Sequence, residues 1–264
     1  MKQELLLVVL LAPAMVVRGQ EGQNSRQLPE ELAVTRSIVM QEEDELESTL
    51  GLDQYGYSRP FERKSSVTAE FEYGLTDRWE LDAEVPYRFR EFDHGRGFTG
   101  VGDVETGIRY GVVPLDKEPV ALDVGLALGI PTGDRRRDLG DGRLELEPSF
   151  TASMWVGRFN VQANGAWRRA VTNDGDEPRN EFEYNVAVLY PVDQCFLALE
   201  GNGISTREST EYYVTPEVIW MAKENLQFLL AVPIGVTRES ADYGVVALVT
   251  FEWEHLTQRG PDKD

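Results

Sequence analysis

The sequence predicts an all-β protein, namely a twelve-stranded antiparallel up-and-down transmembrane β-barrel. Three observations lead to this fold class. Apolar and polar residues alternate with a period of two along most of the chain, as they do in strands that separate two environments. The connections between these segments are tight at one end of the predicted barrel and longer at the other. Aromatic residues gather at both ends of the apolar faces.

The alternating segments follow an irregular polar stretch, and no helical period interrupts them. In one of them, Trp79 and Leu81 alternate with Glu80 and Asp82, so the two sets of side chains point to opposite faces. The twelve predicted strands span residues 45–57, 66–75, 79–92, 102–113, 120–132, 144–156, 160–171, 181–191, 196–204, 211–221, 227–237 and 243–255.

The connections indicate a membrane barrel. Neighbouring antiparallel strands place consecutive connections at opposite ends, and every second connection is tight, as at TDR (76–78) and GRF (157–159). The intervening connections are longer and rich in glycine and charge, as at GDRRRDLGDGR (133–143). Short periplasmic turns and longer outer loops are typical of bacterial outer-membrane barrels. A soluble all-β fold, the alternative interpretation, gives no reason for this asymmetry.

The apolar face is predicted to contact lipid and the polar face to line the lumen. Arginine or lysine near the midplane of the lipid face costs about 2–4 kcal/mol, and this register places none there. Lumen-side prolines at Pro86, Pro131 and Pro233 predict local bulges near the outer rim. Two aromatic belts are predicted at the membrane interfaces, formed by Trp79, Tyr110, Tyr190, Trp220 and Trp253 at the periplasmic end and by Tyr87, Phe89, Tyr184 and Tyr243 at the outer end.

The polar face supplies the candidate functional residues. The candidate pore-lining residues are Glu70, Glu72, Glu80, Asp82, Glu84, Arg88, Arg90, Asp103, Glu105, Arg109, Asp123, Glu145, Glu147, Arg168, Glu183, Glu200, Glu217 and Glu252. Rings of carboxylates favour cations in a pore. In the alternative interpretation these carboxylates pair with the arginines and plug the lumen. The polar face therefore predicts either an open acidic pore or a plugged lumen.

Composition excludes several other functions. The formal net charge is −20, with 46 acidic against 26 basic residues, and no basic stripe is present, so a nucleic-acid partner is not expected. The single cysteine excludes an intrachain disulfide. The two histidines fall at opposite ends of the predicted barrel, His94 in a loop and His255 after the last strand. We therefore predict no enzyme activity, no cofactor and no metal site.

The N-terminus predicts export. A short leading segment precedes LLLVVLLAPAMVV (5–17), and a small residue, Gly19, stands near a plausible cleavage point, so residues 1–19 are predicted to be a cleaved signal peptide. Residues 20–43 are predicted to be an irregular periplasmic segment that either binds a partner or plugs the lumen. Residues 44–255 form the predicted outer-membrane barrel, and residues 256–264 form a polar tail. Outer-membrane lipid is thus one expected partner, and a small-molecule solute is the other.

Several stretches resemble a known family. In order they are YGLTDRWELDAEVPYRFR (73–90), GVGDVETGIRY (100–110), GLALGIPTGD (125–134), YVTPEVI (213–219) and LAVPIGV (230–236). They are similar to the outer-membrane barrels known as the MetA-pathway of phenol degradation family, often called transporter family proteins. The resemblance covers about residues 45–254 and implies a twelve-stranded barrel with a transport role, without implying phenol as the substrate. One departure is the polar tail after Trp253, because many such barrels end on an aromatic residue.

Together these observations predict a bacterial outer-membrane channel or transporter for small solutes, with a narrow, acidic and cation-preferring lumen. The alternative prediction is a structural or loop-mediated binding barrel whose lumen is plugged.

Overall fold

The computed structural model describes residues 28–58, 61–92, 96–115, 119–172 and 179–253. The predicted signal peptide, both histidines and the polar tail lie outside the described residues. Within those ranges, no helix has the length and hydropathy needed to cross a membrane.

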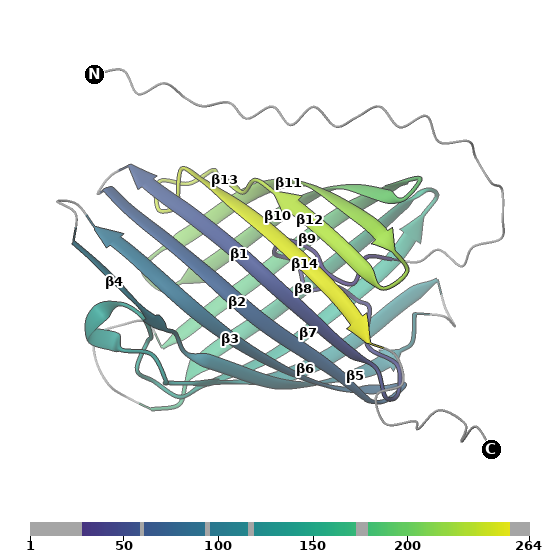
Figure 1. Cartoon of the computed structure of the whole chain (residues 1–264), viewed down its shortest axis with the longest axis horizontal. Helices are drawn as coiled ribbons and strands as arrows, with labels where there is room; N and C mark the ends of the chain where they lie inside the picture. The colour runs from purple at the N-terminus through teal and green to yellow at the C-terminus, as the bar shows by residue number, and fades with distance from the viewer. Residues whose placement is uncertain (1–27, 59–60, 93–95, 116–118, 173–178, 254–264) are drawn as a thin grey trace, which may run out of the picture.

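The described chain forms one antiparallel sheet that closes on itself, because β1 pairs with β14 from Leu46↔Trp253 to Gly56↔Tyr243 (Figure 1). The strands are β1 (Leu46–Ser58), β2 (Phe61–Thr76), β3 (Trp79–Phe92), β4 (Arg96–Val101), β5 (Val104–Val113), β6 (Val120–Ile130), β7 (Glu145–Val156), β8 (Phe159–Ala170), β9 (Asn180–Val192), β10 (Cys195–Thr206), β11 (Thr210–Lys223), β12 (Leu226–Ala231), β13 (Ile234–Gly235) and β14 (Tyr243–Trp253). Within the described ranges, one 3₁₀ turn, η2 (Arg135–Arg137), lies in the β6–β7 loop.

We call each strand position around the barrel wall a stave, and two of these staves are each formed by two shorter strands. β4 and β5 pair with successive parts of β3, and β12 and β13 pair with successive parts of β11. Counted as staves, the strands of the described ranges form a twelve-stranded antiparallel barrel, which confirms the predicted fold class.

Prolines mark both breaks. Beside the first break, the amide of Gly102 donates to the carbonyl of Pro86 at 2.8 Å, and the second break contains Pro233 itself. Proline has no N–H to continue a ladder, so interruptions are expected at these positions. Residues 96–101, which the sequence assigned to a loop, instead form β4 and lengthen the first broken stave.

The outward face of the barrel is apolar. Leu81, Val124 and Leu230 have exposed fractions of 41%, 42% and 44%, although each lies within a regular strand. Large apolar side chains are exposed in the same way on the other staves, and such a surface is far larger than a water-soluble monomer presents. A closed barrel satisfies all of its backbone groups between strands, so this face suits the hydrocarbon of a bilayer.

Aromatic pairs occur at both ends of the outward face. At the tight-turn end, the ring centroids of Trp79 and Tyr110 are 4.6 Å apart. At the long-loop end, Trp167 stacks on Phe182 at 6.3 Å, and Arg169 lies over the Trp167 ring at 5.7 Å. Trp79 and Tyr110 are two of the predicted belt residues, whereas Trp167 and Phe182 are further aromatic residues at the long-loop end.

Buried apolar residues lie on the inside of the barrel, on one part of the wall. Inward side chains from β9 to β12 form this patch, and they include Leu189, Phe196, Ile219 and Leu229, which are at most 6% exposed. The alternating sequence pattern predicted a polar lumen and did not predict this apolar inner wall.

The lipid-facing assignment can be tested with two arginine substitutions at different depths in the bilayer. Leu126→Arg places a cation in the middle of β6, and Val120→Arg places one at its end. In phospholipid vesicles we expect the first substitution to lower the free energy of unfolding by about 2–4 kcal/mol and the second by about 0–1 kcal/mol, because the cost falls from the midplane to the interface. Urea titrations followed by heat-dependent gel mobility measure both. Equal costs at the two depths would contradict the assignment.

Candidate functional site

The candidate site is the lumen, which is occupied by the chain's own N-terminal part. Residues 28–44, called the lumen segment below, run without regular structure inside the wall. The segment turns into β1 at Asp44, whose amide donates to the carbonyl of Gly74 at 3.0 Å. A Cβ on Gly74 would lie 1.8 Å from the carbonyl oxygen of Glu42, so this close crossing requires glycine.

One side of the lumen segment is apolar. Leu28, Leu32 and Ile38 are 2%, 3% and 4% exposed and pack against the apolar inner wall described above. Burial of each such side chain stabilises by roughly 1.5–3 kcal/mol. The apolar inner wall is thus the docking surface for the lumen segment.

Carboxylates of the wall bind the backbone of the lumen segment. Glu217 accepts from the amide of Ala33 at 2.9 Å. Glu200 accepts from the amides of Val34 and Thr35 at 3.1 and 2.6 Å, and also from the Thr35 hydroxyl. Hydrogen bonds to a charged acceptor are shorter and stronger than neutral ones and contribute about 1.5–3 kcal/mol each. These two glutamates therefore anchor the centre of the segment.

Two amide side chains extend this recognition. Gln227 accepts from the amide of Glu30 at 3.0 Å and donates to the carbonyl of Glu31 at 2.9 Å. Gln162 accepts from the amide of Ile38 at 2.9 Å. Sequence reasoning missed both glutamines because it sought charged residues, although each is a polar residue on the inner face of a strand.

Arg109 joins the wall to the lumen segment. Its guanidinium lies 3.0 Å from Glu80 and 3.0 Å from Asp123, and it donates to the carbonyls of Ser37 and Val39 at 2.9 and 3.2 Å. The side chain is only 2% exposed. A buried arginine needs such paired partners, so Arg109 fixes the position of the segment against β3 and β6.

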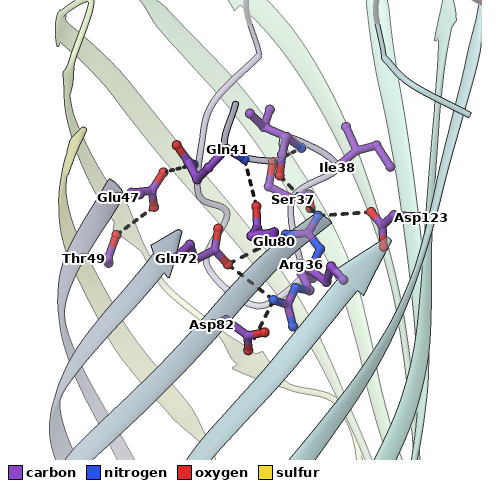
Figure 2. A network of polar contacts seen from close by, with 12 residues as sticks. Arg36, Ser37, Ile38, Gln41, Glu47, Thr49, Glu72, Glu80, Asp82 and Asp123 are labelled. Carbon is purple, nitrogen blue, oxygen red and sulfur yellow. Dashed lines mark hydrogen bonds and ion pairs between the residues drawn. The ribbon is translucent and has the colours of Figure 1, made fainter. Parts of the chain in front are cut away.

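Glu80 also accepts a hydrogen bond from the backbone amide of Gln41 at 2.8 Å, and the Gln41 side chain donates to Glu47 at 2.9 Å (Figure 2). Gln41 therefore links two wall carboxylates through the lumen segment.

A row of directly opposed carboxylates runs across β14, β1, β2 and β3. The cross-strand pairs are Glu252↔Glu47, Glu47↔Glu72 and Glu72↔Asp82. Like charges directly opposite one another destabilise a sheet. Arg36 of the lumen segment lies 3.3 Å from Glu72 and 3.5 Å from Asp82, and Figure 2 shows it reaching toward both. Arg109 of the wall also lies 3.7 Å from Glu72, so the segment supplies a second cation to this row.

A second cationic centre lies nearer the long-loop end. The guanidinium of Arg168 on β8 has five carboxylates within 3.8 Å, those of Glu105, Glu145, Glu147, Glu181 and Glu183. Four of them lie on β7 and β9, the two strands that pair with β8, and Glu105 joins the group from β5. Glu181 was not among the predicted candidates.

The β6–β7 loop folds onto the outer mouth. Arg88 donates to the carbonyl of Leu139 at 3.3 Å, and Arg90 donates to the carbonyl of Asp138 at 3.0 Å. Asp103 accepts from the amides of Gly133 and Asp141 at 2.8 and 2.6 Å. These three candidates hold a loop, with Leu139 2% exposed beneath it.

Two cavities border the lumen segment. One of about 450 Å³ lies between the lumen segment and Arg168, and its wall carries nine carboxylates and three arginines. Another of about 1050 Å³ lies on the tight-turn side of the lumen segment. The lumen segment contributes residues to the walls of both cavities.

The structure places all eighteen predicted pore-lining residues on the inner side of the wall. Seven of them (Glu72, Glu80, Asp82, Arg109, Asp123, Glu200 and Glu217) contact the lumen segment or the arginines bound to it, and five (Glu105, Glu145, Glu147, Arg168 and Glu183) form the Arg168 group. Three hold the outer loop, Glu70 and Glu84 line the 450 Å³ cavity, and Glu252 lies opposite Glu47. Arg36, Glu47 and the two glutamines were missed.

One acidic group has the spacing of metal ligands. Carboxylate oxygens of Glu31, Glu70 and Glu72 lie within 4.8 Å of one another among the described residues. Arg36 already lies 3.3 Å from Glu72, so a protein cation serves this group.

Comparison with known proteins gives a consistent family and fold. A sequence profile of the family described as "Putative MetA-pathway of phenol degradation" matches residues 94–252. Similar solved folds include an outer membrane channel from Pseudomonas putida F1 (TM-score 0.62, 14% identity, 81% of this chain and 97% of that chain) and the NanC porin (0.54, 12%, 78% and 98%). The KdgM porin is also similar (0.53, 9%, 79% and 99%). At these identities the likeness shows the fold. A search of curated protein sequences finds no match.

The anchoring role of Glu200 predicts a local change in backbone protection. Glu200→Gln replaces one accepting oxygen with a donor, so the amides of Val34 and Thr35 lose a charged acceptor. We expect their hydrogen exchange in lipid to accelerate about 10- to 100-fold, which corresponds to the loss of about 1.5–3 kcal/mol. Mass spectrometry of peptides covering residues 28–44 measures it. Glu208→Gln, in an exposed loop, is the control, and equal exchange in both variants would refute the anchor.

Proposed function

Because this chain belongs to the MetA-pathway of phenol degradation family, we propose that it is an outer-membrane channel for small solutes with an acidic, cation-preferring lumen. The observation that carries this proposal is the 450 Å³ cavity, whose wall holds nine carboxylates and three arginines. A barrel that served only as a scaffold would fill its interior with packed side chains. An acidic, partly empty interior instead favours cations over anions. The proposal assigns no catalytic step to the protein.

The proposed location follows from the surface and the N-terminus together. An apolar outward face between two aromatic belts suits a bilayer, and residues 1–19 supply the export signal. The tight turns then face the periplasm, and the long loops face the outside.

The lumen segment is the proposed gate. It lies between the 450 Å³ and 1050 Å³ cavities, and Glu30 lines both of them. Its attachment uses hydrogen bonds and side-chain burial that can be reversed without breaking the sheet. Solutes therefore pass when the segment leaves its seat, and the seated state limits the current.

A second candidate function is favoured by the same segment. If its many wall contacts hold permanently, the barrel is plugged and acts through its outer loops as a structural or binding protein. This candidate predicts no current at any pH, whereas the channel predicts a current that grows when the segment is removed.

The two candidates are separated by planar-bilayer recording. We expect small cation-selective steps from the full mature chain and several-fold larger steps from a chain lacking residues 28–43, because the two cavities then join. Heat-dependent gel mobility confirms that both barrels are folded. A folded barrel without current in both forms would exclude the channel, and anion selectivity would exclude the acidic-lumen argument.

The carboxylates of Glu30 and Glu31 favour the protonated form while the lumen segment lies in the barrel. Removal from water, and then the nearby carboxylate of Glu252, raise the pKa of Glu30 from its usual value of 4.5 to about 8. Removal from water, and then the carboxylate of Glu70, also raise the pKa of Glu31. The charged groups that face this pair are Glu45, Glu80 and Glu252 for Glu30, and Arg36, Glu47, Glu70 and Glu72 for Glu31.

The raised pKa values predict a pH-dependent gate. When the segment is released, Glu30 ionises near pH 4.5, so only the seated state holds its proton between pH 4.5 and about 8. Seating is therefore strongest below this window and weakens as the pH rises through it. We expect open probability to increase from pH 5 to pH 8 and the increase to be smaller in Glu30→Gln. A current that falls over this range would contradict the gate.

A further inference from the structure

Arg168 lies on the proposed route, where it lines two cavities of the lumen. Its guanidinium is 2.7 Å from Glu147, 3.5 Å from Glu105, 3.5 Å from Glu181, 3.7 Å from Glu183 and 3.8 Å from Glu145. The side chain is 30% exposed, so it borders open space as well as its partners. One guanidinium thus serves carboxylates from three other strands.

This arginine separates two cavities. With Glu105, Glu147 and Glu183 it lines the central cavity of about 450 Å³. With Glu145 and Glu181 it also lines a cavity of about 180 Å³ toward the outer mouth. A solute moving between the outer mouth and the centre therefore passes the guanidinium and the surrounding carboxylates.

The group carries more negative than positive charge. Five carboxylates face one guanidinium, which leaves a formal charge of −4 before other neighbours are counted. Arg143, 3.4 Å from Glu145, neutralises one of the five. Asp141 and Arg179 line the same cavity of about 180 Å³, with one charge of each sign, whereas Arg88 and Arg90 donate to carbonyls of the β6–β7 loop. The position that Arg168 fills is accordingly one where any cation would be attracted.

From this geometry we propose that Arg168 is a specificity-determining residue of the channel, whose guanidinium occupies the cation position of the outer constriction. This proposal rests on the proposed channel function. While Arg168 is in place, a permeating cation must share the carboxylates with a fixed positive charge. The five carboxylates surround a planar group with several N–H donors. If the Arg168 side chain is removed, free cations of the guanidinium class therefore fit the position that it leaves.

The test compares substitutions of two neighbouring arginines in the full mature chain. Arg168→Gln removes the charge while keeping most of the volume, and Arg168→Ala removes both. Arg169→Ala is the matched control, because Arg169 lies over Trp167 on the outward face. Bilayer recordings at pH 8 across a KCl gradient give the permeability ratio of K⁺ to Cl⁻.

Both Arg168 variants are expected to raise this ratio by at least about fivefold, and the Arg169 variant to leave it unchanged. A unit charge about 4 Å away is worth about 1 kcal/mol even in water, which corresponds to about fivefold. Millimolar guanidinium chloride should then reduce the K⁺ current of Arg168→Ala and leave the unsubstituted channel unaffected. An unchanged permeability ratio in Arg168→Gln, or a current of Arg168→Ala insensitive to guanidinium, would overturn the proposal.

A measurement of thermal stability, which does not depend on current, tests this proposal separately from the channel function. Guanidinium at millimolar concentration should raise the Tm of Arg168→Ala relative to tetramethylammonium at equal ionic strength, with no such rise in the unsubstituted chain. If the folded unsubstituted barrel carries no current but this rise is seen, the channel function fails while the guanidinium position stands. If the rise is absent, the guanidinium position is refuted. If Arg168→Ala does not fold, the permeability ratio of Arg168→Gln decides the proposal.

Discussion

Closure of the barrel forces the polar face of every stave into one narrow space, where each inner carboxylate must find a donor or a cation. The lumen segment meets much of this requirement. Its amides donate to Glu200 and Glu217, and the guanidinium of Arg36 lies 3.3 Å from Glu72 and 3.5 Å from Asp82. Arg168 does the same for the outer half of the lumen. The acidic interior and the occupied lumen are thus two consequences of one constraint.

The wall is divided in a way that fits a single irregular chain. Strands β9 to β12 carry the apolar inner patch beside Glu200, Glu217 and Gln227, and β1 to β5 present mainly carboxylates and Arg109. The lumen segment has matching sides, with Leu32 and Ile38 against the first part and Arg36 against the second. Apolar burial holds the segment in the lumen, and the directional hydrogen bonds fix its register. Both kinds of contact can be undone without opening the sheet, as a gate requires.

The strands and their faces were predictable because lipid on one side and the lumen on the other impose a period of two, which β3 shows over its full predicted length. The seat of the lumen segment was not predictable, because residues 28–44 have no period and meet partners more than a hundred positions away, such as Gln227. One signal was present. Where Ala187 and Leu189 alternate with Val188, the strand is apolar on both faces, which indicates burial on both. The five partners of Arg168 lie on other strands, so they depend on the strand register and leave no local pattern in the sequence.

The central claim is that wall carboxylates hold the backbone of the lumen segment within the barrel. Solid-state NMR of the isotope-labelled protein in lipid bilayers measures this directly through the contact between the amide nitrogen of Thr35 and the carboxylate carbon of Glu200. The 2.6 Å separation of donor and acceptor predicts a strong cross-peak between them at a pH where the segment is seated. Narrow, mobile signals for residues 28–44 with no such cross-peak would contradict the account.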